Sequence, residues 1–113
     1  MSDQQVQKYD GVVHVRLRPT EAGGRKSAIP STLYRCPVYF GEQREHANDC
    51  AFFFNEVLDE AKPGGPAVRV PIKFFIPELV ADKLKIGARF VLWEGREVGD
   101  AEIIELAGDP QQT

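Results

Sequence analysis

Four side chains in this sequence could ligate a transition metal or act as soft nucleophiles: His14, Cys36, His46 and Cys50. Protein zinc sites usually draw their ligands from closely spaced pairs such as Cys-x-x-Cys. Here only His46 and Cys50 are near one another, four residues apart in a segment without a helical pattern. Neither cysteine carries a local signature of a catalytic nucleophile. We therefore expect structural thiols, with no metal, no cofactor and no enzymatic activity.

Basic side chains offer a second kind of chemistry, because lysine and arginine bind RNA phosphates. The candidates are Arg25, Lys26, Arg35 and Arg96. A net charge of −3 argues against general affinity for nucleic acid or anionic membranes. The charge is uneven, however: residues 8–41 hold six basic and two acidic side chains, and residues 42–60 hold one basic and six acidic side chains. This pattern leaves three alternatives open: a local RNA-binding face, a protein partner of complementary charge, or a solvated surface with Arg25 in an internal salt bridge.

The run Gly24-Arg25-Lys26-Ser27 superficially resembles the end of a phosphate-binding P-loop. A P-loop needs a glycine directly before the lysine and another glycine five residues before that one. Here those positions hold Arg25 and Thr20. We therefore expect no nucleotide binding and no GTP hydrolysis.

Aromatic residues are concentrated in two short runs, 52–54 and 74–75, all of them phenylalanine. In a strand, neighbouring side chains point to opposite faces, so a run of three places at least one ring outside the core. We expect Phe52, Phe54 and Phe75 to form an apolar patch for a partner or a second copy of the chain. The alternative is a barrel wall that a loop partly covers.

The elements that must position these groups are mainly strands, because apolar and polar residues alternate with a period of two. The expected strands are 13–18, 34–40, 49–57, 68–76, 88–93 and 96–106. Pro71 implies an edge or a bulge in the fourth strand, and Glu94-Gly95 forms a hairpin turn between the last two. Residues 77–85 could make one or two helical turns at most. Six strands separated by turns predict an all-β barrel or sandwich.

A chain of 113 residues with two cysteines fits one domain without a disulfide scaffold. We expect this domain at 10–107, with flexible tails at 1–9 and 108–113. No apolar run approaches the ~18 residues of a transmembrane helix, and the N-terminus lacks the apolar core of a signal peptide. We therefore expect a cytoplasmic protein without membrane contact, as a monomer or weak homo-oligomer.

Several short segments stand in order along residues 10–106: Glu21-Ala22-Gly23-Gly24-Arg25, Tyr34-Arg35 with Val38-Tyr39-Phe40, Lys62-Pro63-Gly64, and residues 87–99. They resemble the E-G-G-R turn, the Y-R-P-Q-F strand, the M-P-G turn and the G-L-R-F-A-I-R-E-G-G-R-T-V-G hairpin of the C-terminal barrel (domain III) of translation elongation factor Tu. The resemblance implies a closed six-stranded antiparallel barrel. The chain has no room for the GTPase domain or the middle barrel of that family.

In the family, this barrel contacts the tRNA stem, the middle barrel and the nucleotide-exchange factor. By position, Glu94 and Gly95 match the turn that lies on the tRNA stem, and Lys26 replaces a nearby histidine of the family. Trp93 replaces an arginine of the contact turn, and one glycine of that turn is missing. The resemblance also implies that Arg25, Lys26, Arg35 and Arg96 gather at one end of the barrel. We expect a non-enzymatic module that binds a protein, and the resemblance points to translation components as partners. The alternatives are a binder of tRNA or other structured RNA, and a small enzyme.

Overall fold

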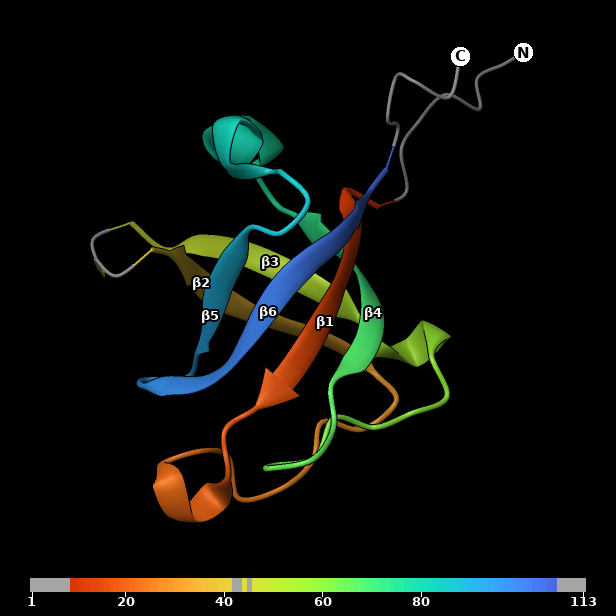
Figure 1. The fold of residues 1–113 in the computed structure, drawn as a ribbon, viewed down its shortest axis with the longest axis vertical. Coiled ribbons are helices and arrows are strands. Elements are labelled where there is room, and N and C mark those ends of the chain that lie inside the picture. Colours follow the sequence, from red (N-terminus) through yellow and green to blue (C-terminus); the bar gives the residue numbers. More distant parts are fainter. Residues whose placement is uncertain (1–8, 42–43, 45, 108–113) are drawn as a thin grey trace.

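Six strands form a closed barrel in the computed structural model, which describes residues 9–41, 44 and 46–107 (Figure 1). The strands are β1 (Gly11–Leu17), β2 (Leu33–Phe40), β3 (Asn48–Phe53), β4 (Val68–Phe74), β5 (Arg89–Trp93) and β6 (Glu97–Leu106). Their order around the barrel is β1-β4-β3-β2-β5-β6, and all neighbouring pairs are antiparallel. The predicted closed six-stranded antiparallel barrel is therefore confirmed.

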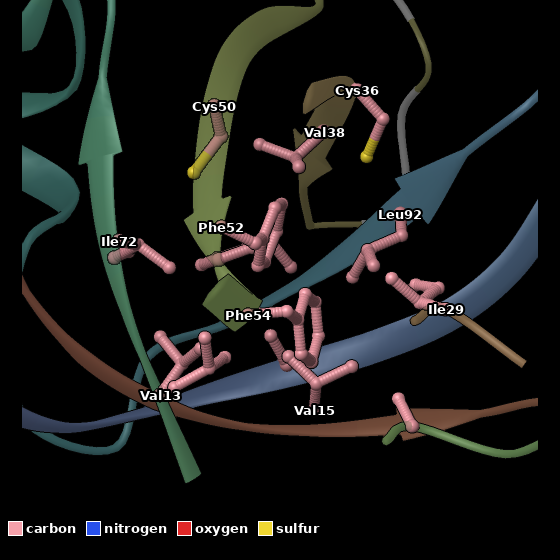
Figure 2. Packing of buried hydrophobic residues seen from close by; sticks show 14 of the residues in the cluster. Val13, Val15, Ile29, Cys36, Val38, Cys50, Phe52, Phe54, Ile72 and Leu92 are labelled. Carbon is pink, nitrogen blue, oxygen red and sulfur yellow. The ribbon is translucent and has the colours of Figure 1, made fainter. Parts of the chain in front are cut away.

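The barrel interior is filled by the side chains that alternation turns inward (Figure 2). At its centre, the Phe90 ring lies 6.3 Å from the Phe52 ring and 5.9 Å from the Phe74 ring, measured between centroids. Ile29, from the loop before β2, is fully buried, and its N–H donates to the carbonyl of Ala61 at 2.8 Å. Each large apolar side chain buried in this way contributes about 1.5–3 kcal/mol. The core therefore includes loop residues as well as strand residues.

The third strand is shorter than expected, and this corrects the prediction for the aromatic patch. β3 ends at Phe53, and residues Phe54–Glu56 form the 3-10 turn η3. Phe52 and Phe54 are both fully buried, so the prediction that they form an exposed patch is wrong. Phe52 belongs to the inward face of β3, and η3 directs Phe54 into the same core. The outward ring of the run is Phe53, which packs edge-on against Tyr9 with centroids 4.9 Å apart.

Pro71 lies in β4 where this strand has a partner on one side only. β4 pairs with β1 from Val68 to Ile72, whereas its pairing with β3 covers Ile72 to Phe74. Proline lacks the N–H that a second ladder would require. Pro71 therefore lies at a local edge of the sheet, as expected, although the barrel as a whole is closed.

Two further 3-10 turns connect strands: η2 (Thr20–Ala22) and η4 (Pro77–Lys83). The short helical segment expected after the fourth strand is thus present as η4, and β4 ends at Phe74 rather than at Ile76. The predicted tails 1–9 and 108–113 lie outside the described residues, apart from Tyr9. In the part of the chain that the structure describes, no helix is long and apolar enough to span a membrane.

Candidate functional site

The Gly23-Gly24 turn and the Glu94-Gly95 turn lie against each other, as the resemblance implies. Gly23 ends η2 with a positive φ of 97°, a conformation that glycine adopts without strain. A Cβ on Gly24 would lie 2.0 Å from the carbonyl oxygen of Arg18, so the two backbones approach as closely as glycine allows. Gly95 also has a positive φ, 77°, which permits the tight β5–β6 hairpin. Glycine at these positions therefore lets each turn close tightly, whereas side chains make the contacts between the two turns.

Glu94 holds the contact between the two turns through its carboxylate. The carboxylate accepts hydrogen bonds from the Arg25 guanidinium and from the Tyr34 hydroxyl. The Arg25 guanidinium also lies 5.6 Å from the centre of the Tyr34 ring, and its Nε donates to the Ser27 carbonyl at 3.1 Å. Arg25 therefore forms an internal salt bridge, which is one of the alternatives that the sequence leaves open.

Arg96 also bonds within the protein. Its Nε donates to the carbonyl of Gly23 at 2.6 Å, and a terminal nitrogen donates to the carbonyl of Gly24 at 3.2 Å. Four predicted site residues, Arg25, Glu94, Gly95 and Arg96, therefore meet at this end of the barrel. Lys26 lies beside them on the exposed surface. Because Arg25 and Arg96 already bond protein groups, an RNA phosphate would have to compete with those contacts.

We call Arg25, Glu94, Gly95 and Arg96 the turn cluster. Arg35 is not part of it, contrary to what the resemblance implies. It points outward from β2, and its guanidinium lies over the Phe75 ring, 4.4 Å from the ring centre. Such stacking is a favourable cation–π contact. The structure therefore divides the predicted site residues between the two turns and a separate surface around Phe75.

Phe75 lies beside two other exposed apolar residues, Ile76 and Leu79. We call these three residues the end patch. Their exposed fractions are 47%, 55% and 61%. They line a hollow of about 100 Å³ together with Ala47, Asn48 and Asp49. The expectation of an exposed apolar surface at Phe75 is therefore met, with different neighbours from those predicted.

The end patch lies where β4 passes into η4, and η4 buries one apolar side chain. Val80 is fully buried, whereas the adjacent Leu79 points away from the core. The N–H of Phe75 donates to the Asp49 carbonyl at 3.1 Å, which ties β4 to the start of β3. Sequence reasoning missed Ile76 and Leu79. The sequence did contain an indication of them, because a segment of about two turns that carries several apolar residues cannot bury all of these side chains.

The two cysteines face each other across β2 and β3, where Cys36 pairs with Cys50. Both are free thiols in the core (Figure 2). Burial raises the pKa of Cys36 to about 11 and the pKa of Cys50 well above its ordinary value. Both thiols therefore stay protonated at neutral pH, and a protonated thiol is a poor nucleophile and a poor metal ligand.

Among the described residues, no group of three or more His, Cys, Asp or Glu side chains is placed to hold a metal ion. The outer wall at β5 and β6 carries another charged cluster, in which Glu97 pairs with Arg18 at 3.0 Å and with Arg44 at 3.5 Å. The Arg44 guanidinium also lies 5.9 Å from the centre of the Trp93 ring. Both guanidinium groups already pair with the one carboxylate, so this cluster offers fewer unpaired charged groups than the surface around Phe75.

A scan against protein-family models gives no match, and a search of curated proteins gives none either. The resemblance to the C-terminal barrel of elongation factor Tu therefore remains a prediction from the sequence motifs.

Proposed function

We propose that this chain is a non-enzymatic binding module that recognises a protein partner through the end patch. The observation that carries the proposal is the group of three large apolar side chains, each about half exposed, around one hollow. Contiguous exposed apolar groups of this kind are typical of protein-binding surfaces. Leu33, Leu58 and Ile86 are exposed too, but none of them lines this hollow.

The non-enzymatic part of the proposal is supported by the state of the reactive side chains. Both thiols are buried and protonated, and Arg25 and Glu94 are engaged in holding two turns together. The RNA-binding alternative has less support, because Arg25 and Arg96 bond internal acceptors. The motifs shared with the elongation factor barrel make translation components the first partners to test.

The apolar contact alone would be weak. Burying the exposed half of each patch residue contributes about 1 kcal/mol, or about 3 kcal/mol for all three. A micromolar complex requires about 8 kcal/mol, after the entropic cost of association has been met. The partner must therefore also contact polar groups near the patch.

Capture from cell lysate tests the proposal when wild type is compared with a patch variant and a matched control. Leu79→Glu introduces a charge at the hollow, and Leu58→Glu introduces the same charge at a side chain that is 99% exposed outside it. We expect both variants to keep the wild-type melting temperature, because exposed substitutions usually change stability by less than about 0.5 kcal/mol.

Proteins captured by wild type and by Leu58→Glu, but lost with Leu79→Glu, would support the proposal. Capture that Leu79→Glu leaves unchanged would refute the end patch as the binding site. Capture of RNA that Lys26→Glu abolishes would instead favour the alternative function.

A further inference from the structure

Arg35 lies next to the end patch, and none of the described residues uses its hydrogen-bond donors. Six other arginines bond a carboxylate or a carbonyl of the protein: Arg18, Arg25, Arg44, Arg69, Arg89 and Arg96. Arg35 is exposed and makes no hydrogen bond or ion pair with any of the residues that the structure describes. Its guanidinium can therefore take a ligand without first breaking an internal bond.

The stacking on Phe75 holds the Arg35 guanidinium in place, 4.4 Å from the ring centre. A guanidinium that is already positioned loses less conformational freedom when it binds a carboxylate, and its donors match the two carboxylate oxygens. Phe75 also lines the hollow of the end patch. One aromatic ring therefore links a carboxylate-binding group to an apolar hollow.

The neighbouring positions on the barrel wall add a second cation. In the register, Ala51 of β3 pairs with Arg35 of β2 on one side and with Lys73 of β4 on the other. The Lys73 ammonium lies 3.9 Å from the carboxylate of Asp10, which offsets part of its charge. Arg35, together with the partly offset charge of Lys73, therefore favours one carboxylate from a partner on this face of the barrel.

Asp49 limits the choice further, because it also lines the hollow. A second carboxylate in the partner would be repelled by Asp49. A run of acidic residues is therefore a poor ligand, and a single one next to an apolar residue is a good ligand.

We propose that the end patch binds a peptide segment of the partner in which one Asp or Glu stands one or two positions from a large apolar residue. The carboxylate bonds the Arg35 guanidinium, and the apolar side chain enters the hollow against Leu79. This inference rests on the proposed function, since it assigns the chemistry of the segment that the same patch binds.

A random peptide library displayed on phage, selected on the immobilised full chain, is the probe. The selected peptides should pair one Asp or Glu with a nearby Leu, Ile, Phe or Met. Synthetic peptides from the selection are then compared with versions in which the acidic residue is replaced by its amide. For wild type, the amide version should bind roughly ten- to a hundred-fold more weakly, the range for a charge-assisted hydrogen bond.

Arg35→Gln completes a double-mutant cycle, and Arg16→Gln is the control. Arg16 is also an exposed arginine without a bonding partner among the described residues, and it lies on β1 away from the hollow. Arg35→Gln should lower the affinity for the acidic peptide by the same factor. It should also abolish the difference in affinity between the acidic peptide and its amide version. Arg16→Gln should change neither value.

Three outcomes would overturn the inference. Selected peptides that lack acidic residues, or an acid–amide difference that persists in Arg35→Gln, would refute the role of Arg35. If the peptides from either of these outcomes still lose binding to the Leu79→Glu variant, the proposed function stands without this inference. If no peptide depends on Leu79, both are refuted.

Discussion

Replacing Glu94 with alanine removes the acceptor that joins the two turns, and its effect can be worked out from the contacts. The carboxylate accepts from Arg25 and from Tyr34, and the exposed fractions of the Arg25 and Glu94 side chains are 20% and 31%. A partly exposed ion pair contributes up to about 1 kcal/mol. Leaving the half-buried Tyr34 hydroxyl without its acceptor costs about 1 kcal/mol more.

We therefore expect Glu94→Ala to lower the free energy of unfolding by about 2 kcal/mol. For a domain of this size, that corresponds to a fall of about 8 °C in melting temperature. Glu94→Gln keeps an acceptor for Tyr34 and loses only the ion pair, so its fall should be about 4 °C. The single tryptophan, Trp93, reports unfolding by fluorescence, and urea titration gives the free energies.

Glu102→Ala is the matched control, because Glu102 also pairs with an arginine. Its pair with Arg89 is far more exposed, with side-chain exposed fractions of 67% for Arg89 and 40% for Glu102. An exposed pair of this kind should contribute less than about 0.5 kcal/mol. If Glu94→Ala and Glu102→Ala have equal effects, the turn cluster does not stabilise the fold, and Arg25 is again a candidate for RNA binding.

The remaining predictions concern the thiols and one glycine. Burial raises the pKa of Cys36 to about 11 and the pKa of Cys50 well above its ordinary value, whereas both thiols ionise near pH 9 in the unfolded chain. Above pH 9 the free energy of unfolding should therefore fall by about 1.4 kcal/mol per pH unit for each thiol. Urea unfolding from pH 8 to about 10.5 measures this slope, and an equally steep slope in a Cys36→Ala, Cys50→Ala double variant would contradict it. For the same reason, neither thiol should react with Ellman's reagent faster than the protein opens, and rapid labelling without denaturant would disprove their burial. Gly24→Ala should destabilise the protein by about 2 kcal/mol, because the new Cβ meets the carbonyl of Arg18, and an unchanged melting temperature would refute that close contact.

Much of the barrel follows from local sequence patterns. The alternation at Val13, Val15 and Leu17 defines the inward face of β1, and these side chains are buried as expected. The Glu94-Gly95 turn joins β5 to β6, since glycine allows the positive φ of the hairpin. These features depend on the side-chain period and on turn residues, which act over a few neighbouring positions.

The candidate site was only partly predictable. Phe52 points inward from β3 and Phe54 from η3, and only the closed barrel makes that side the interior. The sequence could not tell whether Arg25 is free or paired, because its partner Glu94 is 69 residues away. The spacing of residues along one strand therefore determines which side chains share a face. Only closure of the barrel decides which face meets water and which charges meet each other, because the contacts between distant strands form only in the folded chain.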